Sequence, residues 1–105
     1  MVVKAITDEQ YQEKVGNGVS IVDFWATWCG PCRMQSPVLE TISEDKNNIN
    51  FFKVDVDTNP ETAASLRIRA IPTLVVHKDG KIVERLTGFH SKEQLLEILN
   101  GYTEG

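Results

Sequence analysis

Apolar residues along the chain gather in short runs separated by stretches with helical spacing. The run over residues 20–25 is almost continuously apolar, which is typical of a strand covered on both faces of a sheet. Residues 50–56 form a second apolar run, and residues 2–6 read as a shorter strand. We therefore expect residues 20–25 to form a central strand.

Helical patterns lie between these strands. Residues 7–10 (Thr-Asp-Glu-Gln) and 91–94 (Ser-Lys-Glu-Gln) are capping boxes, in which a hydroxyl and an amide bind backbone groups at a helix start. The first predicts a helix to about residue 15, and the second predicts the final helix. Residues 33–45 also have helical spacing, and Pro37 within them predicts a kink because proline lacks an N–H.

Two residue pairs complete the predicted topology. The Asn-Pro pair at 59–60 suits the N-cap and first turn of a short helix through residue 66. The Asp-Gly pair at 79–80 favours a tight antiparallel hairpin between residues 73–77 and 81–86. This order of elements predicts an α/β fold, with a mixed central sheet of about five strands flanked by about four helices.

The composition is that of one globular domain over residues 1–105. With 41% hydrophobic residues, the chain can bury a core without disulfide or metal staples. Its net charge of −4, with acids and bases interspersed, offers no basic face to a nucleic acid or a membrane. Because Lys4 and Asp8 interrupt the N-terminal apolar residues, we expect no secretory signal, no membrane span and a cytoplasmic location.

The only two cysteines, Cys29 and Cys32, lie where the central strand gives way to a helical pattern. On a helix, a step of three residues places two Cα atoms about 5 Å apart on one face. A disulfide needs a Cα separation of about 4.4–6.8 Å, so the pair can close and open with little backbone movement. In a reducing cytosol such a pair is more typical of catalysis or metal binding than of a structural disulfide.

The position of each cysteine predicts its role. Cys29 lies at the helix cap, where unpaired N–H groups and the helix dipole favour a thiolate, so we expect a lowered pKa and a role as the attacking thiol. Cys32, one turn in, is placed to resolve a mixed disulfide on Cys29. Between them, Pro31 suits a first-turn position, and Gly30 lets another chain approach closely.

A zinc site and a static disulfide are weaker interpretations of the cysteine pair. A zinc site needs four ligands, and only His77 and His90 could join the two cysteines. Because His77 alternates with strand residues and His90 lies just before a helix, we expect no metal site. A static structural disulfide is disfavoured in a cytosolic chain.

Asp23 and Trp28 are the most informative residues beside the pair. Asp23 lies among apolar neighbours in the predicted central strand, where burial would raise the pKa of its carboxyl. The alternative is an aspartate at a strand edge that simply reaches solvent. Trp28 either packs in the core or forms an apolar rim around the Cys29 thiol.

The chain resembles the thioredoxin family in its active-site signature, residues 23–32 (DFWATWCGPC). The resemblance covers nearly the whole chain and continues through Pro37, residues 53–57, residues 59–60, residues 71–73, Gly80 and Gly88. A cysteine pair alone is a weak signal, but the pair with all these residues in place is specific. The resemblance implies the thioredoxin fold and a thiol-disulfide oxidoreductase.

The resemblance also implies roles for residues outside the pair. Asp23 would move a proton to and from Cys32, with Lys53 as its charged neighbour. A cis bond would precede Pro72 and leave the Ile71 backbone free to pair with a client strand, although a trans bond is the default for proline. The groove residues implied are Trp28, Gly30, Pro31, Val56, Ala70, Ile71, Pro72 and Gly88. Gly88 could equally serve the turn after the last strand.

Four positions depart from the family pattern. Arg67 stands where the family commonly has glycine, which leaves open how the short helix ends, since a left-handed cap is costly for arginine. Thr27, Arg33 and His77 also replace common family residues. None of these three touches the cysteine chemistry, and we expect them to tune the choice of partner.

The function implied is that of a general protein disulfide reductase that binds no cofactor. The Gly-Pro pair between the cysteines favours the reducing direction, because oxidising relatives usually carry histidine before the second cysteine. A thioredoxin reductase would re-reduce the pair with NADPH, the other partners would be disulfide-containing client proteins, and we expect a monomer. The competing hypothesis is a thioredoxin-like binding or assembly subunit with a redox-independent role.

Overall fold

The computed structural model describes residues 2–103, which form five strands and four helices. The strands are β1 (Val3–Ala5), β2 (Val19–Trp25), β3 (Ile49–Asp55), β4 (Thr73–Lys78) and β5 (Lys81–Thr87), and the helices are α1 (Tyr11–Lys14), α2 (Gly30–Asp45), α3 (Pro60–Ser65) and α4 (Lys92–Thr103). The strands form one sheet in the order β1-β3-β2-β4-β5. β1, β3 and β2 run parallel, whereas β4 is antiparallel to both β2 and β5. The predicted mixed α/β fold is confirmed.

β2 is the central strand, as its apolar pattern predicts. It pairs with β3 on one side and with β4 on the other, and every residue except Trp25 is buried. Burial on both faces explains why the strand reads as a continuous apolar run rather than an alternating one. The strand leads the chain out of the core to the edge of the sheet where α2 begins.

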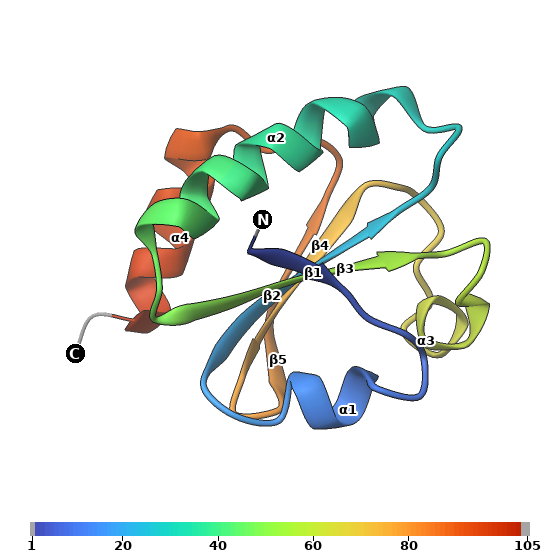
Figure 1. The fold of residues 1–105 in the computed structure, drawn as a ribbon, viewed down its shortest axis with the longest axis horizontal. Coiled ribbons are helices and arrows are strands. Elements are labelled where there is room, and N and C mark those ends of the chain that lie inside the picture. The colour runs from blue at the N-terminus through green and yellow to red at the C-terminus, as the bar shows by residue number, and fades with distance from the viewer. Residues whose placement is uncertain (1, 104–105) are drawn as a thin grey trace.

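Helices cover both faces of the sheet, with α2 and α4 on one side and α1 and α3 on the other (Figure 1). Successive residues of β2 point to opposite faces, so Ile21 belongs to the core under α2 and α4, and Val22 to the core over α1 and α3. Leu39 of α2 and Leu95 of α4 lie in the first core, and Tyr11 lies in the second.

Helix α2 begins at Gly30, three residues before the predicted range, because Gly30 and Pro31 form its first turn. Cys29 is its N-cap, as predicted. The helix continues through Pro37 to Asp45. The kink at Pro37 stays a prediction.

The hairpin between β4 and β5 is built as predicted. Asp79 and Gly80 both have positive φ angles, of 50° and 86°, which is the conformation of the tight turn that joins antiparallel strands with the right twist. The Asp79 carboxylate also accepts a hydrogen bond of 2.8 Å from the N–H of Gly18. The turn is thereby tied to the loop before β2.

Only one of the two predicted capping boxes is complete. At Ser91 both halves are present, since Gln94 N–H donates to Ser91 Oγ at 3.2 Å and Ser91 N–H donates to Gln94 Oε1 at 2.8 Å. At Thr7 only the Gln10 half forms, at 3.0 Å, and the helix begins at Tyr11. The prediction of a helix starting at residue 7 is therefore wrong, because residues 7–10 close a turn of their own through a bond from Gln10 N–H to the Thr7 carbonyl.

Helix α3 is capped by a distant residue rather than by its own N-cap. Asn59 occupies the N-cap position but makes no side-chain cap bond. Instead the Asp8 carboxylate accepts from Glu61 N–H at 3.0 Å and Thr62 N–H at 2.9 Å, while Asn59 Oδ1 accepts from Asp8 N–H at 3.0 Å. The prediction that Asn59 caps α3 is thus wrong, because Asp8 supplies the cap. The hydrogen bonds of Asp8 connect α3 to the start of the chain.

Arg67 forms the left-handed cap at the end of α3. Arg67 adopts the left-handed conformation, with φ 56°, and the N–H groups of Ile68 and Arg67 donate to the carbonyls of Ala63 and Ala64. This is the bond pattern of a left-handed helix cap that normally uses glycine. The guanidinium of Arg85 donates to the Leu66 and Arg67 carbonyls, which stabilises this backbone conformation from β5.

Replacing Ser91 with alanine is expected to lower the free energy of unfolding by about 1 kcal/mol, because the Gln94 N–H loses its cap. Urea unfolding measures the change. Ser65→Ala is a matched control, since that hydroxyl only donates to the carbonyl of Thr62 in its own helix. We expect the control to change stability by less than about 0.5 kcal/mol. Equal effects of the two variants would contradict the capping role.

Candidate active site

The two cysteines form a disulfide at the start of α2. Their Cα atoms lie 5.3 Å apart, inside the range expected from helical spacing. Both are nearly buried, with Cys29 5% exposed and Cys32 3% exposed. Ala26 packs with them, as do the partly buried side chains of Val56 and Ile71. The pair is therefore buried among apolar side chains at the start of α2.

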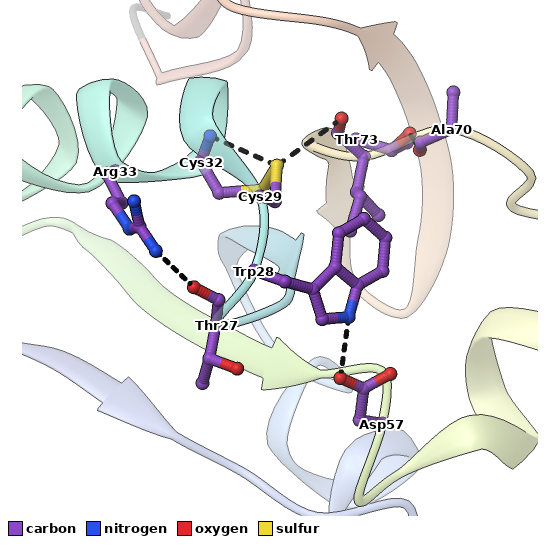
Figure 2. Close-up of a disulfide and its surroundings, with 9 residues drawn as sticks. Thr27, Trp28, Cys29, Cys32, Arg33, Asp57, Ala70 and Thr73 are labelled. Atoms are coloured by element: carbon purple, nitrogen blue, oxygen red, sulfur yellow. Dashed lines mark hydrogen bonds between the residues drawn. A yellow bond between two sulfur atoms is a disulfide. The ribbon is translucent and has the colours of Figure 1, made fainter.

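The backbone around Cys29 favours a negative charge on its sulfur. The N–H of Cys32 points at Cys29 Sγ from 3.2 Å (Figure 2). Because Cys29 is the N-cap of a 16-residue helix, the positive end of the helix dipole also lies at this sulfur. When the disulfide is opened, the N–H group and the helix dipole favour a negative charge on the Cys29 sulfur.

A second loop closes the other side of Cys29. The carbonyl oxygen of Ile71 lies 3.7 Å from Cys29 Sγ, and the Ile71–Pro72 peptide bond is cis, as the resemblance implied. Thr73 Oγ1 donates to the Ala70 carbonyl at 2.5 Å, which fixes the turn that leads into β4. Figure 2 shows this loop approaching the start of α2. The backbone of Ile71 is therefore held beside the reactive sulfur.

Gly88 follows β5 and lies next to the same loop. Its N–H donates to the Pro72 carbonyl at 2.8 Å. Its φ of 87° lies in the left-handed region that favours glycine, although an added Cβ would meet no atom within 4 Å. A turn role for this glycine is therefore supported, and its bond to Pro72 also places it at the edge of the site.

Asp23 is buried beneath the pair, with only 3% of its surface exposed. Within residues 2–103 no group donates a hydrogen bond to its Oδ1 atom. Burial raises the pKa of Asp23 from 3.8 to about 7, against the opposing effect of the positive charge on Lys53, which lies opposite it on β3. The edge-strand alternative for Asp23 is therefore wrong, and the expectation of a raised pKa is confirmed.

Asp23 and Cys32 line one cavity of about 550 Å³. Cys32 and Lys53 line it together with Asp23, and the remaining lining residues are Trp25, Ala26, Thr27, Arg33, Ser36, Pro37 and Glu40. Its space allows water to connect the carboxyl group with the Cys32 sulfur. The Lys53 Nζ atom lies 5.6 Å from the centre of the Trp25 ring at the same place.

Trp28 is exposed at the rim of the site, with 67% of its surface accessible, so the alternative that it packs in the core is wrong. Its indole Nε1–H donates to Asp57 Oδ2 at 2.9 Å, and Figure 2 shows the ring directed at that carboxylate. The N–H of Asp57 in turn donates to Asp55 Oδ1 at 2.9 Å. Asp57 is a site residue that sequence reasoning missed, because its partner lies 29 residues away.

If the pair reduces protein disulfides, as the resemblance implies, replacing Asp57 with alanine is expected to raise the KM for such a client up to about fivefold, because the freed indole no longer keeps one orientation. The kcat should stay unchanged, since Asp57 does not contact the sulfur atoms. Asp57→Asn keeps an acceptor oxygen and should restore most of the affinity. Steady-state kinetics of the three proteins give the result, and an unchanged KM in Asp57→Ala would contradict the role of the bond.

The other residues expected at the site differ in exposure, and Pro72 is buried. Gly30 and Pro31 are exposed in the first turn of α2, and Ala70 is exposed beside Ile71. Of the positions that depart from the family pattern, Arg33 donates to the Thr27 carbonyl at 2.9 Å and so braces the loop before the cysteines. Of the residues that the resemblance placed around the pair, Val56 and Ile71 pack against the cysteines, and Asp23 and Lys53 share a cavity with Cys32.

Neither histidine approaches the sulfur atoms with a metal-binding arrangement. His77 is buried on the α1 side of the sheet, where its Nε2 atom shares a hydrogen bond of 2.7 Å with the Tyr11 hydroxyl, and burial lowers the pKa of His77. The His90 Nδ1 atom bonds the Gly88 carbonyl at 2.9 Å. Within residues 2–103, no three histidine, cysteine, aspartate or glutamate side chains are grouped so that they could hold a metal ion.

Comparisons with known proteins agree with this geometry. The family model described as Thioredoxin matches residues 2–101. A thioredoxin from Listeria monocytogenes is 48% identical over 101 residues, with 95% of this chain and 98% of the relative covered. A thioredoxin from Staphylococcus aureus is also 48% identical over 101 residues, covering 95% of this chain and 97% of the relative.

Solved structures give the same result. A mutant thioredoxin from Halobacterium salinarum superposes with a TM-score of 0.90 at 35% identity, covering 98% of this chain and 91% of that one. A thioredoxin from Malassezia sympodialis superposes with a TM-score of 0.87 at 36% identity, covering 95% of this chain and 90% of that one.

In the part of the chain that the structure describes, no helix has the length and apolar character that a membrane span needs.

Proposed function

Because the chain belongs to the thioredoxin family, whose members are thiol-disulfide oxidoreductases, we propose that it is a general reductant of protein disulfides. The observation that carries the proposal is the position of the pair. Cys29 caps α2 with a backbone N–H pointing at its sulfur, and Cys32 lies one turn away with a Cα separation of 5.3 Å. A thiolate-stabilising cap beside a second thiol suits a two-step exchange.

The proposed exchange has two steps. In the first, the Cys29 thiolate attacks one sulfur of a client disulfide, forms a mixed disulfide and releases one client thiolate. In the second, the Cys32 thiolate attacks Cys29 Sγ, forms the Cys29–Cys32 disulfide and releases the other client thiolate. The client gains two electrons and the pair loses two electrons. The proton of Cys29 has already left to water before the attack, and the proton of Cys32 leaves to a base and from there to water or to a client thiolate.

Asp23 is the proposed acceptor of the Cys32 proton. Its pKa of about 7 allows it to exchange protons near neutral pH, where a general base is most useful. The cavity that both residues line supports transfer through water, since no direct contact between them is needed. The charge on Lys53 favours the ionised carboxylate and so keeps Asp23 able to accept a proton.

The client is proposed to bind as an extended segment across the exposed rim of the pair. The Ile71 backbone beside Cys29 would pair with the main chain of the client, which reads little of its sequence and suits a broad range of clients. Trp28 supplies exposed apolar surface next to the sulfur atoms. The other proposed contacts are Gly30, Pro31, Val56, Ala70, Pro72 and Gly88.

Regeneration requires an outside reductant. We assign it to a thioredoxin reductase that uses NADPH, so this chain itself binds no cofactor. In this scheme residues 1–105 form a single domain that acts as a cytoplasmic monomer. The net charge of −4 supports soluble protein partners over nucleic acid or membrane surfaces.

A coupled turnover assay tests the proposed function. The protein is incubated with NADPH, a bacterial thioredoxin reductase and insulin as the disulfide-bonded client, and NADPH consumption is followed. Wild type should turn over many equivalents of client, whereas a binding or assembly subunit would give no rate above background. A reduction potential as oxidising as that of a disulfide isomerase, about −180 mV, would also contradict the reducing direction.

A further inference from the structure

Gln35 is a fully buried polar residue that the cysteine chemistry does not use. It lies on α2 three residues after Cys32 and has no exposed surface. Its side-chain amide makes two hydrogen bonds to the main chain of one distant residue, His90. Nε2 donates to the His90 carbonyl at 3.1 Å, and Oε1 accepts from the His90 N–H at 2.8 Å.

His90 connects Gln35 to the edge of the client groove. Because a carbonyl can only accept, the His90 Nδ1–H is the donor in its 2.9 Å bond to the Gly88 carbonyl. Gly88 N–H donates to the Pro72 carbonyl at 2.8 Å, and the preceding Ile71 carbonyl lies 3.7 Å from Cys29 Sγ. These contacts therefore connect α2 to residues 88–90, and residues 88–90 to the loop of Ile71 and Pro72. That loop in turn lies beside Cys29 at the start of α2.

The loop formed by residues 88–90 has no regular structure of its own that would fix its position. It bridges the end of β5 and the start of α4, and Phe89 at its centre is 42% exposed. The bonds from Gln35 satisfy both main-chain groups of His90 at once. Without them, two part-buried backbone groups would lack partners, and the loop would shift until they reached water.

We propose that Gln35 is a positioning residue that sets the distance between α2 and the loop of residues 88–90, and thereby the shape of the groove for protein clients. The proposal rests on the proposed function and adds a determinant of client affinity. It predicts an effect on binding and none on the sulfur chemistry, because Gln35 does not line the cavity shared by Asp23 and Cys32. A purely structural glutamine would instead affect stability and leave the KM for clients unchanged.

Gln35→Met separates these two roles, since methionine has a similar length and flexibility but cannot form the hydrogen bonds to His90. For insulin, the KM of the variant should rise about five- to tenfold while kcat changes less than about twofold. For the small disulfide 5,5′-dithiobis(2-nitrobenzoic acid), which does not span the groove, the second-order rate constant should match that of wild type.

Ser43→Ala is the matched control for stability. Ser43 is buried on the same helix and donates to the Glu40 carbonyl, but it is far along α2 from the site. This variant should keep the wild-type KM for insulin, whatever its change in stability in urea. An unchanged KM in Gln35→Met, or an equal rise in Ser43→Ala, would overturn the proposal. Failure of wild type itself to reduce insulin would instead overturn the proposed function on which it rests.

Discussion

Cys32→Ser is expected to accumulate a stable mixed disulfide with its client, whereas Cys29→Ser is expected to accumulate none. Cys29 is the N-cap of α2, where a negative charge on its sulfur is favoured, and it lies beside the Ile71 carbonyl, so we expect it to attack the client disulfide first. Cys32 lies further along the first turn and lines the cavity beneath. Without the Cys32 sulfur, the second exchange cannot occur and the client stays attached to Cys29.

The experiment incubates each reduced variant with insulin and separates the products on a non-reducing gel, with mass spectrometry to identify the linked cysteine. Both variants should show no turnover above background in the coupled NADPH assay, since each lacks one sulfur of the exchange. Wild type is the control and should show the mixed disulfide only transiently. Trapping in Cys29→Ser in place of Cys32→Ser would reverse the assigned roles.

Asp23→Asn is expected to raise the free energy of unfolding of the oxidised protein by about 2–4 kcal/mol at pH 8. The rise in the pKa of Asp23 from 3.8 to about 7 corresponds to about 4 kcal/mol between the protonated and ionised forms. Burial is the main cause, because the ionised carboxylate loses its hydration and the charge on Lys53 compensates only in part. Asparagine is similar in size and stays neutral at every pH.

The sign of the pH dependence follows from the raised pKa. Below about pH 4 the carboxyl of Asp23 is protonated in both the folded and the unfolded chain, so wild type has its highest stability relative to Asp23→Asn. Between about pH 4 and pH 7 the unfolded chain loses the proton first, and the stability of wild type falls relative to Asp23→Asn. Urea unfolding of both proteins across this range isolates the effect, and a constant difference between them would contradict the raised pKa.

The same variant should also slow the release of clients. If Asp23 accepts the Cys32 proton, its loss should reduce turnover of insulin at pH 7 by at least about tenfold, because a positioned general base usually contributes about a hundredfold or more. The mixed disulfide should persist longer than in wild type. The more stable variant would then be the slower one, a combination that a merely structural carboxylate would not produce.

Local sequence patterns predicted the elements and the cysteine geometry well. The continuous apolar pattern of β2 identified its central place, the Asp79-Gly80 pair identified the hairpin turn, and the Ser91 box identified the start of α4. The spacing of Cys29 and Cys32 was enough to predict that they could pair. In each case the feature depends on residues close in sequence, so the local sequence pattern is enough to predict it.

Interactions between distant segments could not be predicted in this way. The carboxylate of Asp8 caps α3 more than 50 residues away, Asp57 holds Trp28, and Gln35 binds His90 across 55 residues. A polar residue in a helix or loop gives no local sign of a partner that only the folded chain brings near. Arg67 shows the same limit, because its left-handed conformation is supported by Arg85 from another strand.

The proposed exchange between the Cys29–Cys32 pair and a client disulfide is tested most directly by following one round of exchange without any reductase. Reduced protein is mixed with an equal amount of insulin, the reaction is quenched with a thiol-blocking reagent, and blocked thiols are counted by mass spectrometry. We predict that each client disulfide opened is matched by one Cys29–Cys32 disulfide formed within the protein. A client that stays oxidised, or cysteines that stay reduced while client disulfides open, would contradict the account.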